Sequence, residues 1–253
     1  MNKLKIYKVI NFKNSSHSII FVIIIIIIII IIFLIINYYY GKFFHKCINC
    51  KPNEVYIIDV KLPEYEIIKN LERQIREGGS RLDPNLNFNN AQGKKLNYNE
   101  LPNNVKIFYE NDDLCRKVSM TVNEKVQYAD FSEKYRIFAR LYENKDDFLE
   151  WHYDNNFTIG NRYTLVIPII VDKFNTSEFM IKDRKTGVEK IIPIPLGKGV
   201  IYNGSVTYHK ISQQTDGQRR MVIIIPFYTN YKKTVIGTMR EHIRNITYKN
   251  LSL

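Results

Sequence analysis

The stretch "FLEWHYDNNFTIGNRYTLVIPII", residues 148–170, decides the fold, because it joins a polar pair to a long apolar run. His152 and Asp154 stand one residue apart, and residues two apart in a strand point to the same face. An imidazole and a carboxylate on one face are two of the ligands that a metal centre needs. A histidine beside a solvated aspartate gives the same spacing, so the pair predicts a site only if a third ligand follows.

The sequence around this stretch predicts an antiparallel β-sandwich or barrel. We expect a strand at 54–60, an amphipathic helix at 62–79 and a polar, asparagine-rich loop at 83–104. In the rest of the chain, short strand-like segments alternate with turn signals, a pattern typical of all-β folds. The isoleucine-rich parts near 165–171 and 222–226 should be buried on both faces. The expected strands are 105–110, 117–122, 135–142, 162–171, 178–183, 190–196, 199–211 and 220–228.

The candidate for the third ligand is His209, in the segment "SVTYHKI" at 205–211. Two histidines and one carboxylate on one side of a metal leave three coordination positions open, the arrangement used by non-haem Fe(II) oxygenases. We therefore predict a metal site at His152, Asp154 and His209. The other histidines lie nearer the two ends of the chain: His17, His45 and His242.

Arg220 opens the apolar strand "RMVIIIPFY", eleven residues after His209. A guanidinium rooted in a buried strand is costly unless a carboxylate pairs with it, and a bound dicarboxylate would do so. Arg219 precedes it, and the alternation of a strand lets only one of the two point inward; we favour Arg220. Tyr142, which ends "YRIFARLY", could bring its hydroxyl to the same ligand.

Four segments in order, "LYENKDDFLEWHYDN", "RYTLVIPI", "GKGVIYNGSVTYHKI" and "RRMVIIIPF", give the chain a family resemblance. It resembles the 2-oxoglutarate- and Fe(II)-dependent dioxygenases, and within them the prolyl 4-hydroxylase-type branch, from about Arg136 to Tyr228. The resemblance implies a double-stranded β-helix, or jelly-roll, barrel of mainly β structure with flanking helices. The family often has a glycine-rich turn before the histidine; here "ENKDDFLEW" stands instead, so this loop must close differently.

The resemblance also implies roles for individual residues. His152, Asp154 and His209 would bind Fe(II), and Arg220, or else Arg219, would bind the distal carboxylate of 2-oxoglutarate. Tyr142 and Thr164 match positions that line the co-substrate pocket. The reaction would use O2 to convert 2-oxoglutarate to succinate and to hydroxylate a C–H bond. Ascorbate is left open as an additional cofactor.

The resemblance leaves the substrate open. A protein or peptide side chain is the first expectation, with proline as the leading residue. A dioxygenase with a lipid or small-molecule substrate would share every site residue. A jelly-roll binding module without metal or activity is the third alternative, although all three ligands and the arginine are present in the sequence.

Residues 19–36, "IIFVIIIIIIIIIIFLII", predict a transmembrane anchor, because eighteen apolar residues without a charge are about enough to cross a bilayer. The run is longer than the core of a signal peptide, and no small-residue cleavage pattern follows it. Close to its two ends, four lysines precede the run (Lys3, Lys5, Lys8 and Lys13) and three follow it (Lys42, Lys46 and Lys51), which favours a type II orientation with a lumenal domain, in the endoplasmic reticulum or Golgi. The remaining parts would be a tail (1–18), a stem (37–54) and the dioxygenase-like domain (55–253).

The formal net charge is +12, but lysine and arginine are scattered along the chain. A basic stripe interleaved with aromatic residues, as in a nucleic-acid groove, is not seen, so no nucleic-acid partner is expected. The expected partners are a protein or peptide substrate, O2 and the membrane.

Overall fold

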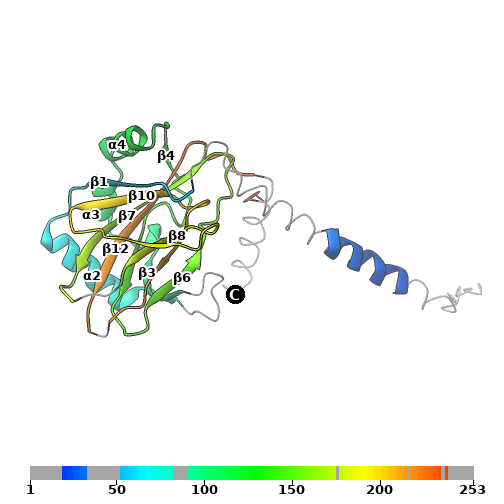
Figure 1. Ribbon diagram of the computed structural model, residues 1–253, viewed down its shortest axis with the longest axis horizontal. Helices are drawn as coiled ribbons and strands as arrows, with labels where there is room; N and C mark the ends of the chain where they lie inside the picture. Colours follow the sequence, from blue (N-terminus) through cyan, green and yellow to red (C-terminus); the bar gives the residue numbers. More distant parts are fainter. Residues whose placement is uncertain are drawn as a thin grey trace, which may run out of the picture. The chain divides into compact units, whose positions relative to one another are not determined.

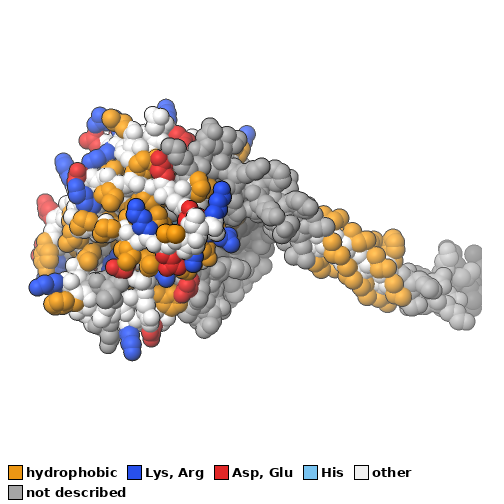
Figure 2. Space-filling model, viewed as in Figure 1, with side chains coloured by type: hydrophobic (Ala, Val, Ile, Leu, Met, Phe, Trp, Pro, Cys, Tyr) orange, Lys and Arg blue, Asp and Glu red, His pale blue; other side chains and the backbone are white. Residues whose placement is uncertain are grey.

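The computed structural model describes residues 19–32, 52–82, 91–174, 177–215, 217–234 and 237–238. The chain divides into two compact units, Met1–Lys46 and Cys47–Leu253. In the first unit, residues 19–32 form a helix with apolar, exposed side chains (Figure 2). Among the described helices, none has both the length and the apolar character required to cross a membrane. Residues 33–36 of the expected anchor and residues 37–51 of the expected stem lie outside the described residues.

The second unit is an antiparallel half-barrel of the jelly-roll type, which confirms the fold class expected from the sequence (Figure 1). Its strands pair in the order β1-β10-β7-β12-β5-β3-β6-β11-β8-β9, and β2 and β4 add to β3 and β12. The strands are β1 (Val55–Asp59), β2 (Ser80–Leu82), β3 (Ala91–Leu96), β4 (Gln127–Tyr128), β5 (Phe138–Tyr142), β6 (Phe148–His152), β7 (Arg162–Val171), β8 (Phe179–Lys182), β9 (Glu189–Ile192), β10 (Lys198–Asn203), β11 (Tyr208–Ile211) and β12 (Arg220–Tyr228).

Strand β3 joins the two halves of the barrel. Its residues Lys94–Leu96 pair with β5 in the larger sheet, and Ala91 and Gln92 pair with β6 in the smaller one. The long central pair is β12 with β7, from Arg220 opposite Val171 to Tyr228 opposite Arg162, with one shift of register between Met221 and Val222. Both strands are buried over most of their length, as their isoleucine-rich sequences predict.

Three helices cover the outer face of the larger sheet: α2 (Tyr65–Gly78), α3 (Asn103–Tyr109) and α4 (Asp112–Val122). In α2, Leu71 and Ile75 are buried one turn apart, as expected from the spacing of its apolar residues. They pack in one hydrophobic core with the outward-facing residues of β12, among them Met221 and Ile223. Because Met221 and Ile223 face the helices, the residues of β12 that alternate with them face the inside of the barrel.

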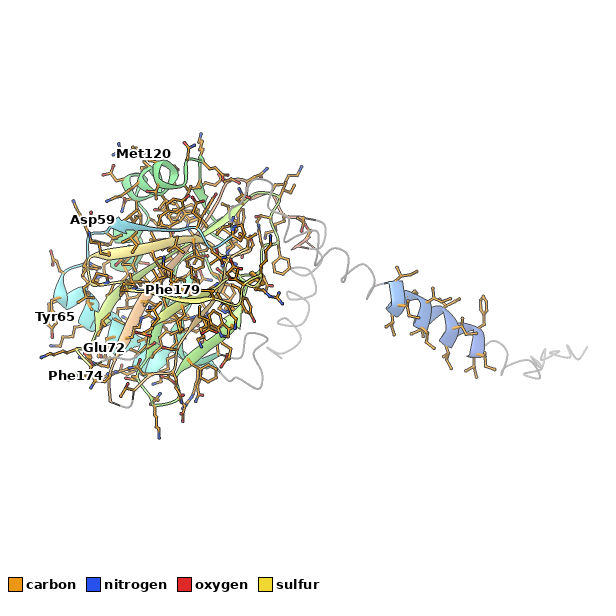
Figure 3. The ribbon with its side chains drawn as sticks, in the orientation of Figure 1. Asp59, Tyr65, Glu72, Met120, Phe174 and Phe179 are labelled. Carbon is orange, nitrogen blue, oxygen red and sulfur yellow. The ribbon has the colours of Figure 1, made fainter. Side chains whose placement is uncertain are left out.

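A second core fills the inside of the barrel. Val222 and Ile224 alternate with the outward-facing residues of β12 and point inward, into one cluster with Val166 and Phe179. Phe179 is labelled in Figure 3. Arg220 stands at the same phase of β12 as Val222 and Ile224. The other members of this inner core include Phe138, Tyr142, Leu149, Ile181, Val200, Tyr202 and Ile211.

Four expectations about the secondary structure were wrong. Segments 105–110 and 117–122, expected as strands, belong to helices α3 and α4. The expected loop 83–104 contains strand β3 and a 3-10 helix at Tyr98–Glu100, whereas its residues 83–90 lie outside the described residues. The single strand expected at 199–211 is two strands, β10 and β11, which belong to different sheets.

Candidate active site

Strands β6 and β11 bring the three predicted metal ligands together. His152 ends β6 and lies directly opposite His209 of β11, with the two ring centroids 4.2 Å apart. Asp154 follows β6, and its Oδ1 atom is 3.6 Å from His152 Nε2 and 3.8 Å from His209 Nε2. One ligand atom from each residue lies within 4.8 Å of the others. Two histidines and a carboxylate therefore surround one point at the end of the barrel.

Backbone carbonyls fix both histidines in the form that binds a metal. His152 Nδ1 lies 2.7 Å from the carbonyl oxygen of Glu150, and His209 Nδ1 lies 2.9 Å from that of Thr207. A carbonyl only accepts hydrogen bonds, so each Nδ1 carries a proton, and each Nε2, which faces Asp154, is the nitrogen available to a metal. This is the outer support that metal-binding histidines usually have. The donor set fits Fe(II), which favours two imidazoles and one carboxylate with open positions.

The protonation states in the site also suit a metal. Burial, together with His152, lowers the pKa of His209 to about 3, so this imidazole is neutral at physiological pH. Burial opposes ionisation of Asp154, but Arg162 and the two histidines hold the pKa of that carboxyl well below its usual range. A neutral imidazole and an ionised carboxylate are the forms in which these residues bind metal ions.

Asp154 is held by groups on three sides. Its backbone N–H donates to the carbonyl oxygen of Gly204 at 2.8 Å, and Thr164 Oγ1 donates to its Oδ2 atom at 2.6 Å. An Nη2 atom of Arg162 lies 3.8 Å from the same oxygen. The sequence placed Thr164 in the co-substrate pocket; the structure places it in the site, where its hydroxyl orients the carboxylate of Asp154.

Two further residues of the site were not predicted. Arg162 stands two residues before Thr164 on β7, so the alternation of that strand could have identified it. Tyr202 is buried on β10, and its hydroxyl lies 3.2 Å from His209 Nε2. Because His209 Nδ1 carries the proton, the Tyr202 hydroxyl donates to the Nε2 atom. This hydrogen bond occupies the lone pair through which His209 would bind a metal.

Arg220 and Tyr142 lie opposite each other on β12 and β5, inside the barrel. Both are buried, with 4% of Arg220 and 1% of Tyr142 exposed. The Nη1 atom of Arg220 is buried without a hydrogen-bond partner, and no ion pair of Arg220 occurs among the described residues. A buried, unpaired guanidinium is costly unless an anion binds to it. Arg220 therefore carries a buried donor beside Tyr142 that a ligand carboxylate could satisfy.

Arg219 points out of the barrel, which corrects its place among the candidate co-substrate residues. Its guanidinium donates to both oxygens of Asp172, at 2.9 and 3.0 Å, and to Glu72 of helix α2 at 2.9 Å. Glu72 is labelled in Figure 3. The alternation of β12 allows one of the two arginines to face inward, and Arg220 does so. Arg219 is already paired with carboxylates of the protein.

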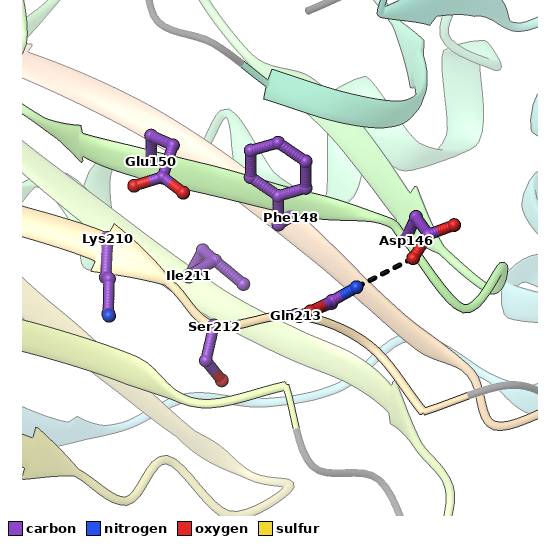
Figure 4. Close-up of a pocket in the computed structure, with 7 residues that line it drawn as sticks. All are labelled: Asp146, Phe148, Glu150, Lys210, Ile211, Ser212 and Gln213. Atoms are coloured by element: carbon purple, nitrogen blue, oxygen red, sulfur yellow. Dashed lines mark hydrogen bonds between the residues drawn. The ribbon is translucent and has the colours of Figure 1, made fainter.

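A hollow of about 430 Å³ lies beside β6 and β11 and contains none of the predicted ligands (Figure 4). Lys210, one of its lining residues, alternates with His209 and so points to the opposite face of β11. Gln213 Nε2 donates to Asp146 Oδ1 across it at 2.7 Å. Its other lining residues are Phe148, Glu150, Ile211 and Ser212. This hollow is separate from the metal ligands.

Comparison of the structure with solved proteins identifies the fold. The non-haem α-ketoglutarate-dependent epimerase SnoN from nogalamycin biosynthesis aligns with a TM-score of 0.53 and 11% identity, over 69% of this chain and 78% of that chain. An oxidoreductase of the 2OG-Fe(II) oxygenase family from Burkholderia pseudomallei aligns with a TM-score of 0.52 and 9% identity, over 72% of this chain and 88% of that chain. This chain has the fold of the 2-oxoglutarate- and Fe(II)-dependent oxygenases.

The resemblance expected from the sequence is therefore confirmed at the level of the fold. A prolyl-4-hydroxylase from Pseudomonas putida also matches, with a TM-score of 0.48 and 11% identity over 69% of this chain and 91% of that chain. A score this low carries no argument about the substrate. No protein-family model and no curated protein matches the sequence. The reaction must therefore be argued from the residues of the site.

Proposed function

We propose that this protein is an Fe(II)- and 2-oxoglutarate-dependent oxygenase that hydroxylates a C–H bond. The observation that carries the proposal is the face formed by His152, Asp154 and His209, with both Nδ1 atoms bound to carbonyls and both Nε2 atoms near one carboxylate oxygen. A metal-free binding module of the same fold would not need that arrangement. Because the ligands and their supports are all in place, we favour the enzyme over the inactive module.

The residues of the barrel would divide the work as follows. His152, Asp154 and His209 would hold Fe(II), and Arg220 with Tyr142 would bind the distal carboxylate of 2-oxoglutarate. Bound there, Fe(II) would supply the oxidative chemistry that couples the decarboxylation of 2-oxoglutarate by O2 to hydroxylation. Thr164 would keep Asp154 in its binding orientation. The apolar inner core would exclude water from the pocket, which strengthens the pairing of Arg220 with a carboxylate.

The proposed substrate is a protein or peptide side chain, with proline as the first residue to test. The support for it is the sequence resemblance to the prolyl 4-hydroxylase-type branch. A lipid or small-molecule substrate would use the same ligands and the same arginine. The loops around the site would determine whether the substrate is a peptide, a lipid or a small molecule, because one fold can act on many substrates.

We also propose that residues 19–36 anchor the protein in a membrane in the type II orientation, with the barrel lumenal. The support is the unbroken apolar run and the excess of lysines before it. Alkaline extraction of membranes from cells that express the full chain tests the anchor. An anchored protein should stay in the membrane pellet. Protease protection of sealed microsomes tests the orientation: the barrel should survive, and its digestion would contradict the lumenal assignment.

The activity is tested with the purified full chain in detergent. Supplied with Fe(II), 2-oxoglutarate, O2 and a panel of proline-containing peptides, it should form succinate and add one oxygen atom to a peptide. His152→Ala should abolish both products. Succinate formation that responds to small molecules or lipids and to no peptide would keep the oxygenase and reject the peptide substrate. No succinate from folded, iron-loaded protein with any of these substrates would contradict the oxygenase.

A further inference from the structure

A second arginine points into the barrel beside the proposed co-substrate pocket. Arg140 is the central residue of β5, and its neighbours two positions away, Phe138 and Tyr142, both belong to the inner core. Residues two apart share a face, so Arg140 faces inward as well. Val222, directly opposite Arg140 on β12, is also an inner-core residue.

The guanidinium of Arg140 is poorly satisfied by the protein. Its Nη1 atom donates to the Tyr142 hydroxyl at 3.4 Å, a long hydrogen bond, and its Nε atom is buried without a partner. Its carbon Cζ lies 5.7 Å from the centre of the Phe138 ring. No ion pair between Arg140 and a carboxylate occurs among the described residues. A guanidinium in this position has donors to spare for a ligand.

Arg140 and Arg220 both interact with Tyr142, one by a hydrogen bond from β5 and the other electrostatically from β12. Arg140 donates to Tyr142, and Arg220 lies directly opposite Tyr142 in the pairing of β5 with β12. Each of the two guanidinium groups keeps a buried nitrogen without an acceptor. The space around the Tyr142 hydroxyl therefore offers donors from two cations and a phenol to one acceptor group.

Among the described residues, no carboxylate is in contact with Arg140 or Arg220, although Asp154 attracts Arg140 from a distance. Asp154 lies beside a different arginine, Arg162, at 3.8 Å, and contacts both histidine ligands. Arg140 and Arg220 therefore have no carboxylate of their own among the described residues. A buried guanidinium without a contacting anion is unfavourable by electrostatics, and a ligand carboxylate that reaches both Arg140 and Arg220 would pair with each of them.

We propose that Arg140 is a second binding residue for the distal carboxylate of the dicarboxylate co-substrate, which it grips together with Arg220 and the hydroxyl of Tyr142. The inference rests on the proposed function and deepens it, because it assigns a specificity-determining residue that the sequence analysis did not identify. Arg140 would make the pocket select dicarboxylic over monocarboxylic keto acids. Two guanidinium groups on one carboxylate can form more charge-assisted hydrogen bonds than Arg220 alone.

The test compares two keto acids that differ only in the distal carboxylate. The affinities of 2-oxoglutarate and 2-oxopentanoate are measured by calorimetry, without oxygen, on the Fe(II)-loaded full chain. Arg140→Leu should weaken 2-oxoglutarate binding by roughly ten- to a hundredfold and leave 2-oxopentanoate binding unchanged. Arg140→Lys, which keeps the positive charge but loses the planar guanidinium, should bind 2-oxoglutarate with an affinity between those of the wild type and Arg140→Leu. Arg219→Leu, the matched control on the outside of the barrel, should bind 2-oxoglutarate like the wild type.

Two results would overturn the inference: unchanged 2-oxoglutarate binding in Arg140→Leu, or an equal loss for both keto acids. A second measurement separates this inference from the proposed function. Glutarate, a dicarboxylate without the keto group, should raise the melting temperature of the metal-free wild type, and Arg140→Leu should abolish the rise. If the iron-loaded wild type binds no 2-oxoglutarate, the proposed function fails, while the glutarate shift still decides whether Arg140 binds a carboxylate.

Folding of the variant is checked in the same experiment. The guanidinium of Arg140 has no ion pair to lose, so replacing it by leucine should leave the melting temperature of the ligand-free protein unchanged or raise it. A large drop in this melting temperature would show that Arg140 supports the fold, and would overturn its assignment as a residue that waits for a ligand.

Discussion

Gly204 lies so close to Asp154 that a side chain would not fit between them. A Cβ atom built on Gly204 would be 2.1 Å from Asp154 Oδ2 and 2.7 Å from Asp154 Cβ. The two residues are also joined by the hydrogen bond from the Asp154 N–H to the Gly204 carbonyl oxygen. The turn after β10 is therefore part of the wall that positions the carboxylate ligand.

Gly204→Ala is predicted to displace the carboxylate of Asp154 and to weaken Fe(II) binding by at least about tenfold, since small displacements of a ligand or its supports cost roughly that much. Equilibrium dialysis with Fe(II) under anaerobic conditions measures it. Gly78→Ala is the control, because nothing lies within 4 Å of a Cβ at Gly78. Normal iron binding by Gly204→Ala would mean that the geometry around Asp154 does not limit the site.

Thr164→Val is predicted to lower the affinity for Fe(II) by about tenfold or more, because it removes the 2.6 Å hydrogen bond to Asp154 and keeps the shape of the side chain. Thr164→Ser keeps the hydroxyl and should restore most of the affinity. The two variants are compared by metal titration. Equal loss in both would assign the effect to packing of the Thr164 methyl group instead of to the hydrogen bond.

Tyr202→Phe is predicted to bind Fe(II) at least as tightly as the wild type. The Tyr202 hydroxyl donates to His209 Nε2 at 3.2 Å, and a metal must displace this hydrogen bond to reach the nitrogen. Removing the hydroxyl removes the competition and leaves the tautomer of His209 fixed by the Thr207 carbonyl. A competition titration with a chelator gives the affinity. A clear loss of iron in Tyr202→Phe would show that the hydroxyl supports the metal site.

Arg219→Leu is predicted to lower the free energy of unfolding by about 0.5–1 kcal/mol, the range for a partly exposed ion pair. Its hydrogen bonds lower the pKa of Asp172 below the usual value. A carboxyl with a depressed pKa contributes stability at neutral pH and loses it as the pH falls through that pKa. The difference between wild type and variant, from urea denaturation, should therefore shrink below about pH 4. A difference that does not change with pH would contradict the Arg219–Asp172 pairing.

The sequence predicted the barrel and the metal ligands because both depend on local patterns. Alternation placed His152 and Asp154 on one face, and the long apolar run predicted the buried strand β7. Helix α4 was missed, although Leu114, Val118 and Val122 follow a helical spacing and are buried. Asn111, which accepts from the Leu114 N–H, marks its start. The β-branched residues Val118, Thr121 and Val122 favour a strand, which competes with this spacing in the sequence.

Other features depend on pairing between distant parts of the chain. Strand β3 has a polar sequence, "AQGKKL", and owes its extended form to pairing with β5 and β6. The inward direction of Arg140 could have been read from Tyr142, two residues later, but its lack of a partner could not. The same holds for Arg162 beside Asp154, since an ion pair depends on the position of both side chains.

The central claim is that His152, Asp154 and His209 hold Fe(II) beside a pocket for 2-oxoglutarate. Anaerobic addition of Fe(II) and 2-oxoglutarate to the purified full chain tests it directly, because the chelate has a visible charge-transfer band. We predict a band that is absent in His152→Ala, weakened in Arg220→Leu and unchanged in Arg219→Leu. A folded wild-type protein that binds Fe(II) but gives no band with 2-oxoglutarate would contradict the account.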